Sequence, residues 1–392
     1  MIKIIKNAKI YAPEFIGKKD IVLAGGKILY IGENLSPNCC FPIETEVLDG
    51  QGKLLLPGFI DNHVHILGGG GEGGYKTRTP EISLTDLTKG GITTVVGCLG
   101  TDGTARSMMS LLAKAKGLRE EGISAFIYSG SYRVPITTIT GDIPTDIMSI
   151  EEIIGIGEIA VSDHRSSQPS LEELKRLAAD ARLGGILSGK AGVVNLHVGD
   201  GLRMIDFLFE MIEKTEIPAS QFLPTHMNRN PYLFKEAIRY GKSGGYIDFT
   251  TSSDPVFWEE GEVKTSKALK TCLAEGVPAG NITFSSDGQG SLPVFNEKRE
   301  CIGLGVGKCT SLFDEVRDAV LKDGVPLEIA LRVITSNPAA VLKLQEKGHI
   351  MAGYDADLVL VSEDSLEIDT VIAKGQIMVH NKGIKVSDTF CR

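Results

Sequence analysis

Five side chains of the kind that bind transition metals fall at comparable places along the chain. His63 and His65 are two residues apart in FIDNHVHI, and residues at i and i+2 of a strand point to the same side. The chain has only seven histidines, yet His197, His226 and Asp287 each close a further apolar run. Neutral imidazoles with a carboxylate suit Zn²⁺, and Mn²⁺, Co²⁺ or Fe²⁺ accept the same ligands. An HxH pair alone is a weak signal, but the repeated placement predicts a metal site.

A scaffold that collects the ends of several strands would bring these residues together. From residue 54 onward, short apolar runs alternate with longer amphipathic stretches, which is typical of a parallel sheet built from βα units. Strands are expected over residues 58–66, 93–99, 124–129, 158–162, 193–198, 222–226, 246–251 and 282–286. Helices are expected, for example, over residues 83–89, 106–121, 171–187, 264–275, 311–322 and 327–334.

Eight such units predict the α/β class and a (β/α)8 TIM-type barrel. They span roughly 240 residues, close to the usual length of this barrel, whose catalytic mouth lies at the carboxyl ends of the strands. A doubly wound open sheet is the structural alternative. It is disfavoured because no GxGxxG opens a helix after the first strand, and the glycines of residues 68–74 precede no phosphate-binding pattern.

Both ends of the chain are rich in strand signals. Short β-branched runs occupy residues 2–5, 9–11, 20–23 and 27–31, and similar runs return at 357–361, 370–373 and 376–380. Because an isolated two-stranded piece is marginal in water, the two ends are expected to meet in a second, smaller, discontinuous β-sandwich domain. The expected organisation is a β-domain over residues 1–56 and 345–392 that flanks a catalytic barrel over residues 57–344.

Composition narrows the classes of partner. The 392 residues include 41 Lys and Arg against 50 Asp and Glu, a net charge of −9 that argues against nucleic acid or an anionic membrane. No apolar run approaches the ~20 residues of a membrane-spanning helix, and the opening MIKIIKNAKIYAP lacks the core of a signal peptide. Seven cysteines without a CxxC predict a reduced, cytoplasmic protein without a cysteine-rich zinc site.

Several longer segments carry a resemblance to a known family. HVH after the first strand, a histidine after the fifth and sixth, and an aspartate after the eighth resemble the amidohydrolase superfamily. Within that superfamily the chain resembles the isoaspartyl (β-aspartyl) dipeptidases over essentially its whole length. The segments that carry this narrower resemblance are GFIDNHVHILGGGGEGG, TRTPE, VVGCLGTD, TITG, SDHRS, LPTHMNRN and SSDGQGS. The tail GHIMAGYDADLVLV resembles the return of the superfamily's chain into its β-domain.

The resemblance implies a site with two zinc ions. The more buried ion would be held by His63, His65 and Asp287, and the second by His197 and His226. In this family a carboxylated lysine after strand four normally bridges the ions, but alignment on the SDHR stretch places Glu158 there. A glutamate is anionic at neutral pH and can bridge two cations without CO2. We therefore expect Glu158 to bridge; the alternative is a loosely bound second ion.

The same resemblance assigns the chemistry of hydrolysis. Metal ions lower the pKa of a bound water to about 7, which makes a strong nucleophile at neutral pH. Asp287 would act as general base and then as general acid towards the leaving amine. Tyr132, in SGSYRVP, would stabilise the oxyanion, although a packing tyrosine would give the same sequence.

A β-aspartyl dipeptide has a free α-amine and a free α-carboxylate beside an isopeptide bond. A selective pocket needs an acid for the amine and arginines for the carboxylate. The loops after strands one, four and six supply Glu72, Arg165 and Arg229, which match the family's substrate contacts, as do Thr101 and Ser291. The expected partner is thus a small dipeptide.

Other functions share this metal site. A cyclic amidase of the dihydroorotase or hydantoinase type, or a deaminase, would keep the ligands and change the substrate, and a non-catalytic scaffold would be expected to lose ligands. Glu72, Arg165 and Arg229 favour the dipeptide. The family resemblance also implies a homo-oligomer, up to an octamer.

Overall fold

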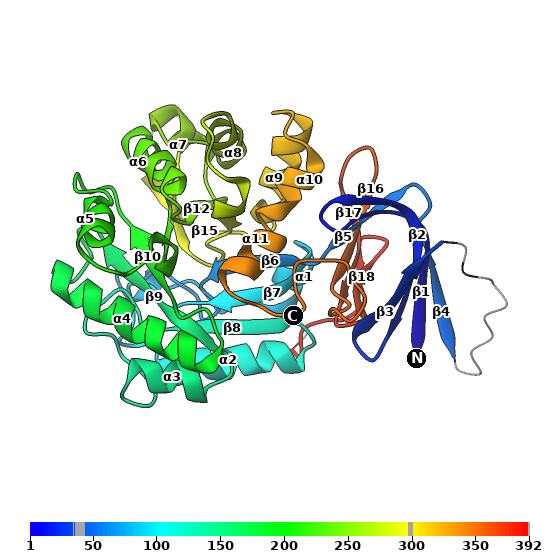
Figure 1. The fold of residues 1–392 in the computed structure, drawn as a ribbon, viewed down its shortest axis with the longest axis horizontal. Helices are drawn as coiled ribbons and strands as arrows, with labels where there is room; N and C mark the ends of the chain where they lie inside the picture. The colour runs from blue at the N-terminus through cyan, green and yellow to red at the C-terminus, as the bar shows by residue number, and fades with distance from the viewer. Residues whose placement is uncertain (34, 36–43, 297–300, 391–392) are drawn as a thin grey trace.

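The computed structural model describes residues 1–33, 35, 44–296 and 301–390. A barrel surrounded by helices takes up most of the chain, and a sheet made of both chain ends stands beside it (Figure 1). The fold class expected from the sequence is confirmed. None of the helices in the described part of the chain is long and apolar enough to cross a membrane.

Eight parallel strands make the barrel. The first six form one sheet in chain order, and the last two pair with each other. Main-chain hydrogen bonds close the ring: Met227 N donates to Asp248 O (3.2 Å), and His65 N donates to Gly288 O (2.9 Å). The strands are β6 (Phe59–Val64), β7 (Ile92–Gly97), β8 (Ser124–Ser129), β9 (Ile153–Val161), β10 (Val193–Val198), β11 (Phe222–Thr225), β12 (Ile247–Thr250) and β13 (Ile282–Ser285).

Helices cover the outside of the barrel, and their ends follow from the sequence. In α4, the side chain of Ser170 accepts from the backbone N–H of Glu173, and the carboxylate of Glu173 accepts from the backbone N–H of Ser170. Gly189 ends the helix at φ 73°. The helices are α1 (Leu84–Thr88), α2 (Met108–Glu120), α3 (Ile143–Ser149), α4 (Leu171–Ser188), α5 (Asp206–Lys214), α6 (Pro231–Lys242), α7 (Pro255–Glu260), α8 (Thr265–Ala274), α9 (Ser311–Leu321), α10 (Leu327–Arg332) and α11 (Ser336–Val341), with short 3-10 turns η1 (Tyr75–Thr77), η2 (Ala219–Gln221) and η3 (Ala279–Asn281).

The chain ends meet in one nine-stranded sheet. Strand β5 pairs antiparallel with β16, where Leu55 lies opposite Leu360, and both side chains join a core with Ile5, Ile10 and Ile21. The expected β-sandwich thus takes the form of a single hydrogen-bonded sheet, while the domain limits at residues 57 and 344 stay a prediction. Its strands are β1 (Ile2–Tyr11), β2 (Phe15–Ala24), β3 (Lys27–Gly32), β4 (Thr45–Asp49), β5 (Lys53–Pro57), β16 (Leu358–Ser362), β17 (Ile368–Ala373), β18 (Gln376–His380) and β19 (Gly383–Ile384).

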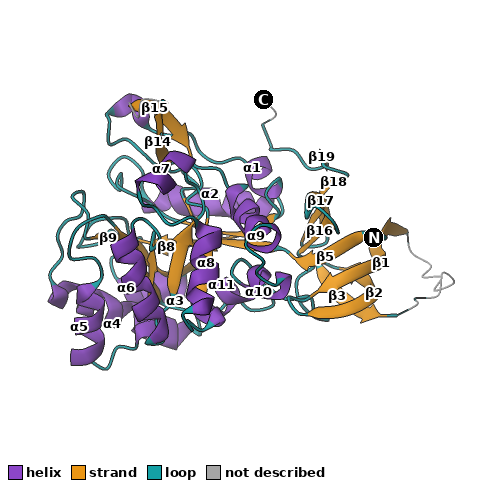
Figure 2. Ribbon diagram, turned by 90° about the horizontal axis from the view of Figure 1, so that it is seen from above, coloured by secondary structure: helices purple, strands orange, loops and turns teal. Residues whose placement is uncertain are grey.

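Two features at the barrel differ from the sequence-based expectation. Strand β9 begins at Ile153 instead of residue 158, so Glu158 lies inside a fully buried strand and does not open it. A hairpin follows the eighth strand, made of β14 (Ser291–Phe295) and β15 (Cys301–Val306), and Figure 2 shows it at the rim, apart from the barrel strands.

The cysteines whose side chains are described are free thiols. Cys98, Cys272 and Cys309 are buried without a disulfide. Three further cysteines of the sequence, at positions 39, 40 and 391, lie outside the described residues.

Candidate functional site

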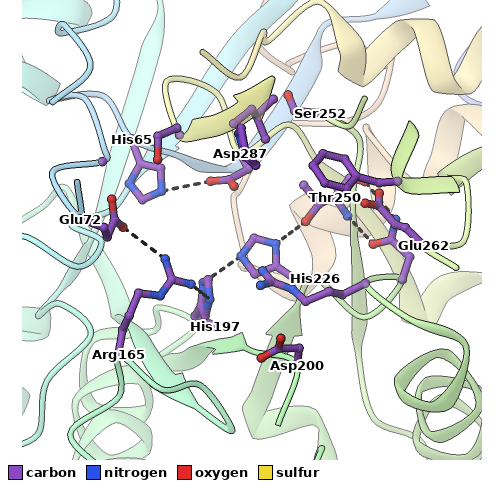
Figure 3. Close-up of a pocket in the computed structure, with 18 of the residues that line it drawn as sticks. His65, Glu72, Arg165, His197, Asp200, His226, Thr250, Ser252, Glu262 and Asp287 are labelled. Carbon is purple, nitrogen blue, oxygen red and sulfur yellow. Dashed lines mark hydrogen bonds and ion pairs between the residues drawn. The ribbon is translucent and has the colours of Figure 1, made fainter. Parts of the chain in front are cut away.

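A cavity of about 480 Å³ opens at the carboxyl ends of the barrel strands. Figure 3 shows His65, His197, His226 and Asp287 converging on it from different strands. This is the end of the barrel at which the sequence placed the metal ligands. The loops after the strands form the walls.

The deepest part of the site is a cluster of two histidines and two carboxylates. His63 Nε2 lies 3.3 Å from Glu158 Oε2 and 3.7 Å from Asp287 Oδ1. His65 Nε2 lies 3.5 Å from Glu158 Oε1 and 3.0 Å from Asp287 Oδ1. Two ligands of one tetrahedral zinc ion, bound at 2.0–2.3 Å, stand about 3.5 Å apart. The spacing therefore fits a cation between these groups.

A second group of three side chains shares Glu158. Oε2 of Glu158 lies 3.1 Å from Nδ1 of His197, and that nitrogen lies 2.9 Å from Nε2 of His226. All three side chains are buried. Glu158 thus faces both pairs of histidines, as a bridging carboxylate would.

Unpartnered carboxylate oxygens support a cation at this place. Oε1 of Glu158 and Oδ1 of Asp287 are buried and accept no hydrogen bond. Burial would raise the pKa of Glu158, but His63 and His197 outweigh burial and hold this pKa well below its ordinary value. A buried anion with an unpartnered oxygen is costly unless a cation compensates it. The donor set therefore fits a divalent metal.

His63 and His226 differ in how firmly they hold a proton. Burial would lower the pKa of His63, but Cys98 and Glu158 outweigh it and keep that pKa well above its ordinary value. Burial and the neighbouring His197 lower the pKa of His226 well below its ordinary value. His226 is therefore neutral and ready to act as a ligand, whereas a metal must displace a proton from His63.

Cys98, which directly follows β7, adds a sulfur atom to the deep cluster. Its Sγ lies 3.6 Å from His63 Nε2 and 3.8 Å from His65 Nδ1, close enough for these atoms and Glu158 to hold one ion. Sequence reasoning missed this residue, because a single cysteine without a second nearby carries no spacing signal. Its place at the end of a predicted barrel strand was the available clue.

Lys190 lies near the start of a barrel strand, and it cannot supply the bridging lysine that is usual in the family. Its amine donates to the carbonyl oxygens of Ile147, Ile150 and Ile153, at the opposite end of the strands from the cluster. Among the described residues near the two histidine pairs, Glu158 is the carboxylate that reaches both.

Tyr132, in the loop after β8, is buried at the edge of the cluster. Its hydroxyl lies 2.8 Å from Nδ1 of His197. Burial and the charge of Glu158 raise the pKa of Tyr132 well above its ordinary value, so the phenol keeps its proton. Tyr132 can therefore act as a hydrogen-bond donor in the cavity.

Three of the expected substrate residues form one hydrogen-bonded group at the mouth. Thr101 Oγ1 donates to Glu72 Oε1 (2.8 Å), and Arg165 Nη1 lies 3.2 Å from the same oxygen. Figure 3 shows this Glu72–Arg165 pair beside His65 and His197. The structure thus brings together an acid and an arginine next to the candidate metal site.

The glycine-rich loop that carries Glu72 is held by fixed contacts. Gly68 has φ +78°, and a Cβ there would lie 2.2 Å from Thr79 O, so only glycine fits this turn. Arg106 donates from Nε to Leu67 O (3.0 Å) and from Nη2 to Gly69 O (3.1 Å). The close packing at Gly68 and the side chain of Arg106 therefore position the loop.

The other wall of the cavity carries Arg229 and Ser291, together with residues not expected from the sequence. Leu292 and Pro293 of the β14–β15 hairpin line it, as does Glu262. Burial raises the pKa of Glu262 to about 7, while a hydrogen bond from Ser253 and the charge of Arg229 act in the opposite direction.

The three remaining histidines lie elsewhere. The side chain of His164 is 86 % exposed, in the loop after β9. His349 Nδ1 lies 3.1 Å from Ala12 O, and His380 Nδ1 lies 3.0 Å from Thr370 Oγ1, both in the region of the nine-stranded sheet. Four of the seven histidines therefore lie together in the candidate metal site.

Comparison with solved structures gives a full-length match. The chain is 50 % identical to a β-aspartyl dipeptidase from Fervidobacterium islandicum AW-1, solved in complex with the dipeptide β-Asp-Leu, with a TM-score of 0.91 and 100 % coverage of both chains. A family model for the amidohydrolase family matches residues 221–378. The chain belongs to the β-aspartyl dipeptidase family. The resemblance found in the sequence is confirmed.

More distant relatives of this β-aspartyl dipeptidase family member share the fold. A D-hydantoinase structure is 19 % identical with a TM-score of 0.68 and covers 99 % of this chain and 97 % of that chain. An adenine deaminase from Ruegeria sp. (strain TM1040) is 24 % identical over 98 % of this chain, which spans 58 % of that relative's length. At these identities the likeness extends to the fold alone.

Proposed function

We propose that the protein hydrolyses the isopeptide bond of β-aspartyl dipeptides. The observation that carries the proposal is the full-length, 50 % identical dipeptidase structure that contains β-Asp-Leu. The Glu72–Arg165 pair beside the histidine–carboxylate cluster supports it, because an α-amino acid group presents both a cation and an anion.

We further propose that the cofactor is Zn²⁺, with two ions in each subunit. His63, His65 and Asp287 would hold the deeper ion, with Cys98 as an additional ligand, His197 and His226 would hold the second, and Glu158 would bridge them. When bound, such ions lower the pKa of water and polarise a carbonyl group. Imidazole, carboxylate and thiolate ligands suit zinc.

The remaining steps belong to the chain's own residues. Asp287 takes a proton from the attacking water at its carboxylate and delivers it to the leaving amine. Tyr132, which keeps its phenolic proton, donates a hydrogen bond to the oxygen on which negative charge develops. Glu72 accepts from the α-amine of the aspartyl group, supported by Thr101, while Arg165 and Arg229 bind carboxylate, and Ser291 lines the same cavity.

One assay decides between this function and its main alternative. The zinc-loaded protein is incubated with β-Asp-Leu, dihydroorotate and hydantoin, and the products are quantified. We expect release of leucine and aspartate and no opening of either ring. Turnover of the cyclic amides alone would replace the proposal by a cyclic amidase on the same metal site.

The metal content, the oligomeric state and the cellular location are further predictions, and each can be measured directly. Elemental analysis of the active protein should give two zinc ions per chain, and one ion would remove the bridging role of Glu158. We also predict a homo-oligomer, up to an octamer, which light scattering of the purified protein tests, and a cytoplasmic location, which cell fractionation tests.

A further inference from the structure

Asp163, in the loop after β9, has no role in the site described so far, yet it contacts two of its members. Its Oδ2 lies 3.2 Å from His197 Nε2 and 2.7 Å from Arg165 Nη2. Its Oδ1 accepts from Arg165 Nε (2.9 Å) and from Arg165 N (2.8 Å). Four donors from two functional residues therefore converge on one carboxylate.

The contact with His197 defines which nitrogen of that ring faces the candidate metal site. Nδ1 points to Glu158, while Nε2 points away from the cluster towards Asp163. Arg165 Nη2 also lies 3.2 Å from Nε2, but this nitrogen already donates to Asp163 Oδ2 at 2.7 Å. Because a carboxylate only accepts, the contact with Asp163 places the ring proton on Nε2 and leaves the lone pair on Nδ1. A carboxylate behind a ligating histidine fixes both the tautomer and the orientation of its ring.

The contact between Asp163 and Arg165 defines which nitrogen of the Arg165 guanidinium is left to face the substrate. Nε and Nη2 are both held by Asp163 in a two-pronged pair, the strongest geometry for arginine and carboxylate. Nη1 is directed at Glu72 across the mouth. Asp163 therefore fixes the plane of the guanidinium and presents one edge of it to the cavity.

Burial and the close approach of a second loop hold Asp163 in this position. The residue is only 5 % exposed. A Cβ at Gly199, which follows β10, would lie 2.6 Å from the Cβ of Asp163, so a side chain at 199 would displace it. The loop of Asp163 is tied to the loop after His197 by the hydrogen bond from Gly201 N to Ser162 O (2.8 Å). An ion pair on a freely moving surface loop would have none of these features.

We propose that Asp163 is a positioning residue that couples the metal site to the substrate site by holding His197 and Arg165 with a single carboxylate. The Arg165 half rests on the proposed function, because it assumes that Arg165 binds a substrate carboxylate. The His197 half requires only that the cluster binds a metal.

The test compares Asp163→Asn with the wild-type protein and with Glu236→Gln, which removes a carboxylate from a surface ion pair with Arg239. An amide has one acceptor oxygen for the four donors. We expect Asp163→Asn to lose affinity for Zn²⁺, measured by competition with a chelator, by about 10- to 100-fold. We also expect its KM for β-Asp-Leu to rise about tenfold, while Glu236→Gln matches the wild type.

A double variant separates the two halves. In an Arg165→Met background, the substitution Asp163→Asn should still weaken Zn²⁺ binding but should no longer change KM. If Asp163→Asn raises KM with unchanged Zn²⁺ affinity, Asp163 serves the arginine alone and the coupling is refuted. Equal losses in Glu236→Gln would refute it as well.

A measurement on the wild type covers the case in which the variant does not fold. In the zinc-loaded protein, long-range ¹H–¹⁵N NMR should show the ring of His197, assigned by its loss in His197→Asn, protonated at Nε2. Protonation at Nδ1 would overturn the proposal. Should the wild type fail to hydrolyse β-Asp-Leu, the proposed function falls, and the NMR and Zn²⁺ measurements still decide the His197 half.

Discussion

Glu72 and Arg165, which are 93 positions apart in the chain, form an ion pair of 3.2 Å across the mouth of the cavity. An α-amino acid group carries the same two charges in one molecule. In the proposed function, binding of the aspartyl end would exchange this internal ion pair for two pairs with the substrate, so that little net charge is left unpaired with or without the substrate.

The proposed exchange assigns recognition of the substrate's free amine to Glu72. Glu72→Gln should raise the KM for β-Asp-Leu about tenfold or more with a smaller change in kcat, since the lost contact is made in the bound ground state. The wild type should also reject the N-acetylated dipeptide, and Glu72→Gln should discriminate less between the two. Glu81→Gln, on the same loop and paired with Lys114, is the matched control. Unchanged discrimination would remove Glu72 from substrate binding.

The glutamate in β9 predicts that carbon dioxide plays no part in assembling the metal site. Reconstitution of the metal-free protein with Zn²⁺ should give the same activity with and without bicarbonate, because Glu158 carries its charge without modification. Glu158→Gln should lose at least one zinc ion, measured by elemental analysis. Activity that follows the bicarbonate concentration would show that another residue bridges the ions.

Cys98 can be tested by spectroscopy independently of turnover. A thiolate bound to Co²⁺ gives an intense charge-transfer band in the near ultraviolet, which imidazole and carboxylate ligands lack. The Co²⁺-substituted wild type should show this band, and Cys98→Ser should not. Cys272→Ser, which removes a buried thiol from helix α8, should keep the band. A wild-type spectrum without the band would leave Cys98 as a packing residue.

The raised pKa of Glu262 predicts how substrate binding depends on pH. Its carboxyl group titrates near pH 7, so it is neutral below and anionic above that value. As the pH rises through 7, the new charge competes for Arg229 and repels the substrate's carboxylates. KM for β-Asp-Leu should therefore increase several-fold between pH 6 and pH 8. Glu262→Gln should show a smaller increase, and an identical profile would exclude this cause.

The sequence located those parts of the site that depend on periodicity. The positions of His63, His65, His197, His226 and Asp287 follow from one rule, that the carboxyl ends of barrel strands share a face. The start of β9 was misplaced because glycines interrupt the apolar run IIGIG before Glu158. The strand pattern therefore predicts the fold class more accurately than the first and last residues of each strand.

The missed residues depend on contacts between loops. Asp163 matters because two loops approach closely at Gly199, and no local pattern in either loop shows this meeting. Glu262 acquires its raised pKa mainly from burial, with a smaller contribution from the charge of Glu315, and both depend on how α7 and the loop after it pack. The contact between these loops and the pKa of Glu262 exist only in the folded chain, whereas the periodicity of apolar residues is present in the sequence itself.

The pairing of β5 with β16 bears on how the protein is made. Residue 55 finds its partner at residue 360, so the ribosome must synthesise nearly the whole chain before the first sheet can be completed. Until then the apolar edge of Leu54, Leu55 and Leu56 is available to other chains, which is a known route to aggregation. Protection of this edge during synthesis, by a chaperone or by rapid formation of the barrel, should therefore govern the yield of folded protein.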